Sequence, residues 1–163
     1  DDEKLRWINY EHLRQTPMPQ YRMLAENVGM PLEGHDEDFV NAALATCQEK
    51  VKSLPDLPSF GAFYFTDDFP VDSDFGEKAM TQENLSALAA LRDAYVAVES
   101  FEADALEASL KQLAEELGVK VRVLVQPARF ACTGQKVGPS LYHLMEVLGR
   151  EKVLVRFDRT LDL

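Results

Sequence analysis

The chain is poor in the residues that usually hold metals or form disulfides. Its 163 residues include two cysteines, Cys47 and Cys132, and three histidines. The cysteines are far apart and each has apolar neighbours, which favours two core thiols in a reduced, cytoplasmic protein over a disulfide or a nucleophile. None of these residues has the spacing of a zinc or calcium site, so we expect no metal in the chain.

Long apolar runs and glycine-rich phosphate loops are also absent. No run of about 18 apolar residues could span a membrane, and no signal peptide is visible. No glycine-rich loop follows a predicted strand and no G-x-S-x-G elbow occurs, so neither a nucleotide site nor a serine-hydrolase site is indicated. The chain begins at Asp1 without a methionine, which suggests a processed protein or a piece of a longer one.

Basic residues are fewer than acidic ones, yet one segment contains no acid. The chain holds 28 acidic and 17 basic residues, a net charge of −11, which disfavours broad binding to nucleic acids. Residues 118–145 contain neither Asp nor Glu but include Lys120, Arg122, Arg129 and Lys136. This acid-free window could accept a polyanion. It could equally be a solvated loop that offsets its acidic surroundings, and charge alone does not decide between the two.

Apolar residues recur at helical spacing through most of the chain. The spacing predicts helices over 5–14, 19–27, 36–54, 81–98, 106–117, 141–148 and a last short one over 153–157. Asp36 and Thr81 are the expected N-caps, and Gly118 and Gly149 are the expected helix ends. These signals together predict a helical protein.

Valines at alternate positions from 119 to 125 fit either a short strand or a helix that ends at Gln126–Pro127. No other segment offers a partner strand, so a helix is favoured and the chain is predicted to be all-α. Its character changes near Glu99–Ser100. We therefore expect two helical subdomains, 1–99 and 100–163.

Four segments carry a recognisable family pattern. Residues 3–9 read EKLRWIN and residues 65–71 read FTDDFPV. Residues 118–141 contain GVK, QPAR, CTG and GPSL in that order, and residues 147–151 read VLGRE. Together these segments resemble the C-terminal anticodon-binding region of bacterial glutamyl-tRNA synthetases, which are class I aminoacyl-tRNA synthetases. The resemblance spans nearly the whole chain.

The resemblance implies two helical subdomains that form a helical cage for an anticodon. It implies part of a glutamate–tRNA ligase, an ATP-dependent enzyme of protein biosynthesis. The chain lacks HIGH-like and KMSKS-like motifs, so we expect it to be inactive alone and to hold no cofactor, with ATP and Mg²⁺ acting in the absent catalytic domain. The expected partner is tRNA for glutamate, with tRNA for glutamine left open. We expect a monomer that binds neither DNA nor membranes.

The family's anticodon contacts are carried over residue by residue. Arg129 matches the arginine of the family's Q-P-L-R segment, which meets the anticodon loop. Gly138, Pro139 and Leu141 match the loop and helix start that enclose its bases. Tyr142 stands where the family has a phenylalanine, and it can still stack on a base.

Lys50 lies outside the acid-free window. It aligns with a position where glutamate-specific enzymes often have an arginine that reads the third anticodon base. Lysine keeps the charge but not the planar fork that bidentate recognition needs. The remaining cations of the window, Lys120, Arg122 and Lys136, are expected to meet tRNA phosphates.

A rival hypothesis from a different class is an acidic helical module that binds a basic protein partner. Salt-sensitive tRNA binding that depends on the anticodon would favour the first hypothesis. A stable protein complex without tRNA binding would favour the second.

Overall fold

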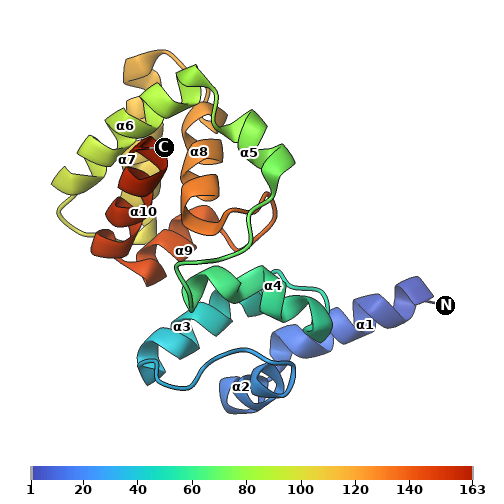
Figure 1. Ribbon diagram of the computed structural model, residues 1–163. Helices are drawn as coiled ribbons and strands as arrows, with labels where there is room; N and C mark the ends of the chain where they lie inside the picture. The colour runs from blue at the N-terminus through green and yellow to red at the C-terminus, as the bar shows by residue number, and fades with distance from the viewer. Residues whose placement is uncertain (1, 163) are drawn as a thin grey trace. The chain divides into compact units, whose positions relative to one another are not determined.

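The computed structural model describes residues 2–162, except for the side chains of residues 2 and 5–8 (Figure 1). The Leu5–Ile8 side chains of the EKLRWIN segment therefore lie outside the described residues. Every regular element within 2–162 is helical, which confirms the all-α prediction. No described helix is long and apolar enough to cross a bilayer.

Contacts within the chain define two compact units. The first holds the residues up to Asp68 together with Val137–Ser140, and the second holds Phe69–Lys136 and the residues from Leu141 onward. The predicted boundary at 99/100 falls inside the second unit, because the helix before it packs on later helices there. The subdomains 1–99 and 100–163 stay a prediction.

The first unit is built on four helices. They are α1 (Asp2–Gln15), α2 (Met18–Asn27), α3 (Glu37–Gln48) and the short α4 (Leu57–Gly61), which 3-10 turns at Leu54–Asp56 and Ala62–Tyr64 flank. The Asp36 carboxylate accepts from the Phe39 amide at 3.2 Å, as expected of an N-cap. α3 ends at Gln48 rather than near 54, since Ser53 is extended before the turn that contains Pro55.

The second unit contains the longer helices. They are α5 (Ser73–Ala79), α6 (Gln82–Ala97), α7 (Ala103–Leu117), α8 (Arg122–Thr133), α9 (Leu141–Leu148) and α10 (Arg150–Asp162). The Thr81 hydroxyl accepts from the Asn84 amide at 3.2 Å. Gly118 and Gly149 end their helices with φ of +66° and +89°. The predicted caps and helix ends are confirmed.

The prediction that the helix near 119–125 ends at Gln126–Pro127 is wrong. α8 instead begins at Arg122 and runs through Pro127 to Thr133. A proline in the second turn of a helix removes one backbone donor, whose partner would be the Val123 carbonyl. The Pro127 ring is buried, so its packing offsets the lost bond, and the alternating valines form the start of a helix rather than a strand.

Charged side chains join helices of the second unit. Arg92 on α6 makes two hydrogen bonds to Asp158 on α10, at 2.7 and 3.2 Å. Glu146 on α9 accepts from the Ala103 amide at 2.9 Å and so caps α7. Arg150 donates to the carbonyls of Val96 and Val98 at the end of α6, where a cation suits the helix dipole.

Two glycines allow α5 to lie directly against α8. A β-carbon at Gly76 would be 2.9 Å from the Phe130 ring, and one at Gly134 would be 2.9 Å from the Pro70 carbonyl oxygen. Gly134 also has φ of +72°, a left-handed conformation that side chains disfavour. The Asp72 amide donates to the Gly134 carbonyl at 2.8 Å. The α5–α8 contact thus depends on residues without side chains.

We expect Gly134→Ala to lower the free energy of unfolding by about 2–4 kcal/mol, because a strained φ adds to a steric clash. Gly118→Ala is the matched control, since Gly118 has a similar φ with open space around it. It should lose only about 1 kcal/mol. Urea unfolding measures the free energy of unfolding of both variants. Equal losses of free energy in the two would show that the contact of residue 134 with Pro70 is not tight.

Both thiols are buried, as the sequence predicts, and burial raises the pKa of Cys47 and of Cys132 to about 12. Almost no thiolate exists at pH 8 when a thiol pKa lies that high. We expect neither cysteine to react with Ellman's reagent at pH 8 in the folded protein, and both to react in guanidinium. Rapid reaction of one thiol equivalent with the reagent in the folded protein would contradict the burial of that thiol.

Candidate nucleic-acid interface

A hollow of about 380 Å³ in the second unit lies between α5 and α8. Figure 1 shows these two helices beside one another, α5 in green and α8 in orange. The hollow is lined by three cationic side chains, two acidic ones, an amide and two apolar ones: Lys78, Arg129, Lys136, Asp72, Asp74, Gln126, Phe75 and Val125. We call it the α5–α8 hollow.

Helix geometry places the α8 residues of this hollow on one face. Val125 and Gln126 precede Arg129 by four and three positions, which is the spacing of side-by-side residues on a helix. Arg129 is half-buried, whereas Lys136 on the following loop is exposed. The loop is fixed beside α5, because the Gln135 amide group donates to the Pro70 carbonyl at 2.8 Å.

Acidic residues enter the hollow from α5. Asp72 caps α5 by accepting from the Phe75 amide at 3.1 Å, and Asp74 lies in the first turn. Both suit the positive end of a helix dipole. The window that is acid-free in the sequence therefore has carboxylates beside it in space. A site with both donors and carboxylates fits a base edge together with a phosphate better than an isolated polyanion.

The structure brings together only some of the predicted site residues. Arg129 and Lys136 share the α5–α8 hollow. Lys120 instead lines a separate, wide hollow beside α7 with Lys111, and Arg122 is exposed at the start of α8. α8 is 12 residues long, about 18 Å at the helical rise, so its two ends present separate cationic positions.

The residues that follow Lys136 differ in burial. Leu141 is buried at the start of α9, and Tyr142 is half-buried. Burial raises the pKa of Tyr142, and the nearby Glu107 adds to the effect. Gly138 and Pro139 belong to Val137–Ser140, which groups with the first unit. The side chain of Leu141 thus holds α9 in the core of the second unit.

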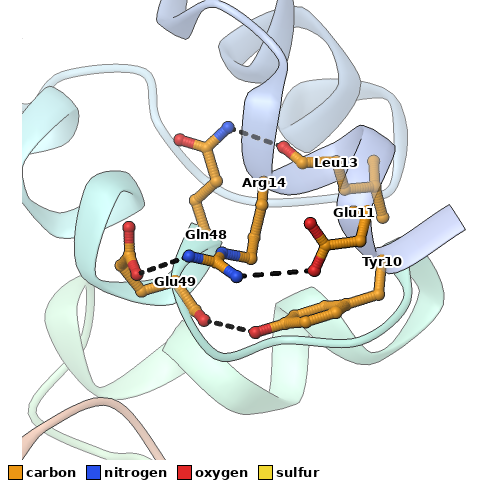
Figure 2. A network of polar contacts seen from close by, with 6 residues as sticks. All are labelled: Tyr10, Glu11, Leu13, Arg14, Gln48 and Glu49. Atoms are coloured by element: carbon orange, nitrogen blue, oxygen red, sulfur yellow. Dashed lines mark hydrogen bonds and ion pairs between the residues drawn. The ribbon is translucent and has the colours of Figure 1, made fainter. Parts of the chain in front are cut away.

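Lys50 is exposed in the first unit, just after α3. Its neighbours fix the chain there, as Figure 2 shows. The Gln48 amide group donates to the Leu13 carbonyl at 2.7 Å, and the Tyr10 hydroxyl donates to the Glu49 carbonyl at 2.9 Å. Arg14 adds an ion pair with Glu49 at 3.7 Å. The turn that presents Lys50 is therefore held against α1 while the Lys50 side chain remains accessible.

Sequence reasoning missed four polar residues of the α5–α8 hollow, which are Asp72, Asp74, Lys78 and Gln126. Gln126 was part of the QPAR segment, and its spacing from Arg129 could have placed it on the same helical face. Lys78 had no such signal, because only the packing of α5 on α8 brings it to the hollow. Among the described residues, no group of three His, Cys, Asp or Glu side chains could hold a metal ion.

The helical fold matches solved structures of aminoacyl-tRNA ligases. A crystal structure of a glutamate–tRNA ligase from Elizabethkingia meningosepticum superposes with a TM-score of 0.81 and 21% identity. The match covers 99% of this chain and 32% of that chain. At this identity the likeness shows the fold, which is a helical region of such ligases.

The family described as anticodon binding domain matches residues 12–161, and the chain belongs to that family. Among curated relatives, it is 31% identical to glutamate–tRNA ligase 2 of Caldicellulosiruptor saccharolyticus over 99% of this chain and 34% of the relative. It is 32% identical to the glutamate–tRNA ligase of Moorella thermoacetica over 98% of this chain and 34% of that relative. The chain thus spans about a third of the length of these relatives and matches their C-terminal region.

Proposed function

We propose that this chain is the anticodon-binding part of a glutamate–tRNA ligase and holds the anticodon of tRNA for glutamate. The observation that carries the proposal is the position of Arg129. It lies in the α5–α8 hollow beside Gln126 and Lys136, within the region that the anticodon binding domain family matches.

The hollow suits an unstacked base. Anticodon bases are single-stranded, and proteins read such bases through their edges and faces. The Arg129 guanidinium offers a planar fork of donors, and the Gln126 amide offers both a donor and an acceptor. Because Arg129 is half-buried, its hydrogen bonds compete less with water than those of an exposed lysine. A good base contact of this kind is worth about 1–3 kcal/mol.

The residues from 138 onward would complete the site. Gly138 and Pro139 would bring backbone groups toward the bases, and Tyr142 would offer part of its ring for stacking. Leu141 would act through the position of α9, because its side chain is buried. Lys120, Arg122 and Lys136 would hold phosphates. The proposed arrangement uses subdomains 1–99 and 100–163, with Lys50 on the first and Arg129 on the second.

The whole ligase would use ATP and Mg²⁺ in a catalytic domain that this chain does not include. The chain would contribute recognition of tRNA and no chemical step. We further propose that it acts as a cytoplasmic monomer, and that tRNA for glutamine is a second substrate if Lys50 discriminates weakly.

Filter binding of the chain to anticodon hairpins of the glutamate and glutamine tRNAs tests the function. We expect salt-sensitive binding that depends on the anticodon sequence. Binding that ignores the anticodon would overturn the proposed anticodon recognition, and a stable complex with a basic protein and no RNA affinity would favour the interaction module instead.

Arg129→Ala should weaken binding of the glutamate hairpin about tenfold or more, because a base contact of about 1–3 kcal/mol is lost. Charging by the intact ligase should fall as well. Arg129→Lys is the matched control, since it keeps the charge without the planar fork, and its affinity should be intermediate. Unchanged affinity together with unchanged kcat/KM for charging would rule out the role of Arg129.

Lys50→Gln should relax discrimination between C and G at the third anticodon base, because it removes the charged donor. A competition assay with both hairpins measures the ratio. Lys52→Gln is the control, since Lys52 lies two residues away, over the Tyr10 ring at 5.6 Å. Lys50→Arg should sharpen the discrimination. A ratio that stays constant in all three variants would exclude Lys50 from reading the third base.

A further inference from the structure

Lys78 lines the α5–α8 hollow from the opposite wall to Arg129, and it belongs to none of the segments that resemble the synthetase pattern. It lies in the last turn of α5 and is exposed. Among the described residues, no carboxylate lies within ion-pair distance of its ammonium group. An ion pair therefore does not account for its position at the hollow.

The contacts between α5 and α8 show that the two helices run antiparallel. Asp72 at the start of α5 bonds to Gly134 at the end of α8, and Gly76 in the middle of α5 faces Phe130. Continuing this register places Lys78 nearer the start of α8, beside Val125 and Gln126. These three side chains do line the same hollow.

The three cations of the hollow are consequently spread along it. Lys136 follows the end of α8, Arg129 lies within α8, and Lys78 lies toward the other end. Gly134 and Gln126 are eight residues apart, which is about 12 Å along a helix. A row of cations with this spread suits a strand with successive phosphates better than a single anion.

The acidic residues of the hollow also come from α5. Asp72 caps the helix, Asp74 lies in its first turn and Lys78 lies in its last turn. Asp74 and Lys78 are four residues apart, so the carboxylate lies one helical turn from the ammonium. The three cations of the hollow outnumber its two carboxylates, which leaves a small excess of positive charge for a phosphate.

We propose that α5 forms one wall of the RNA groove and that Lys78 binds a backbone phosphate of the anticodon loop. The proposal rests on the anticodon-binding function and adds a residue outside the family pattern. Lysine is a compact charge with three rotatable donors and no acceptor, which suits a phosphate and carries no base information. Arg129 and Gln126 would read the base, and Lys78 would hold the strand beside it.

The test compares Lys78→Ala with Lys152→Ala for binding to glutamate and glutamine anticodon hairpins at several salt concentrations. Lys152 is a lysine on α10 of the same unit, outside the α5–α8 hollow, so its variant has the same net charge. We expect Lys78→Ala to weaken both hairpins equally, by about 3- to 10-fold, and to reduce the salt slope by about 0.7, the value for one phosphate of a single strand. Lys78→Arg should restore the affinity.

Equal affinities of Lys78→Ala and Lys152→Ala would overturn the proposal, and so would a loss for one hairpin only, because that would indicate base reading. Circular dichroism of each variant checks that the helices are retained. If the unmodified chain binds neither hairpin, the anticodon-binding function fails and this inference fails with it. If the unmodified chain binds the hairpins and Lys78→Ala binds them as tightly as the control variant does, the anticodon-binding function stands and Lys78 has no part in it.

Discussion

The close approach of α5 to α8 is the constraint on which the candidate site depends. It exists because Gly76 leaves room for the Phe130 ring and Gly134 leaves room for the Pro70 carbonyl. Without this approach, Arg129 would lie on an open helical face, and Lys78 and Asp74 would have no part in its surroundings. A short helix of seven residues thereby turns one side of α8 into a hollow with two walls.

Charge in this protein has to be judged in space rather than along the chain. The acid-free window suggested a basic docking segment within an acidic protein. In the folded protein, Asp72 and Asp74 lie beside this window. Lys120 and Arg122 lie near the start of α8, outside the α5–α8 hollow. What remains at the hollow is a small excess of positive charge, and such a surface favours selective contact over general attraction to polyanions.

Local signals accounted for most of the helices, because caps such as Asp36, Thr81 and Gly118 act through neighbours within a few residues. They failed at Pro127, where buried packing of the ring outweighs the loss of one backbone bond. They also gave no hint of Lys78, since its position depends on contacts between segments about fifty residues apart. Arg129 could be named from the sequence through a family pattern, but its partners in the hollow required the fold.

Two charged side chains near the junction of α9 and α10 hold the connection between α6 and α7 in place. Glu146 on α9 accepts a hydrogen bond from the Ala103 amide, and Arg150 at the start of α10 donates to the Val96 and Val98 carbonyls. Both side chains thus bind to the connection between α6 and α7. The segment around Glu99–Ser100, where the character of the sequence changes, is therefore held on both sides by hydrogen bonds within the second unit. α9 thus helps to fix the connection between α6 and α7 from a position 43 residues further along the chain.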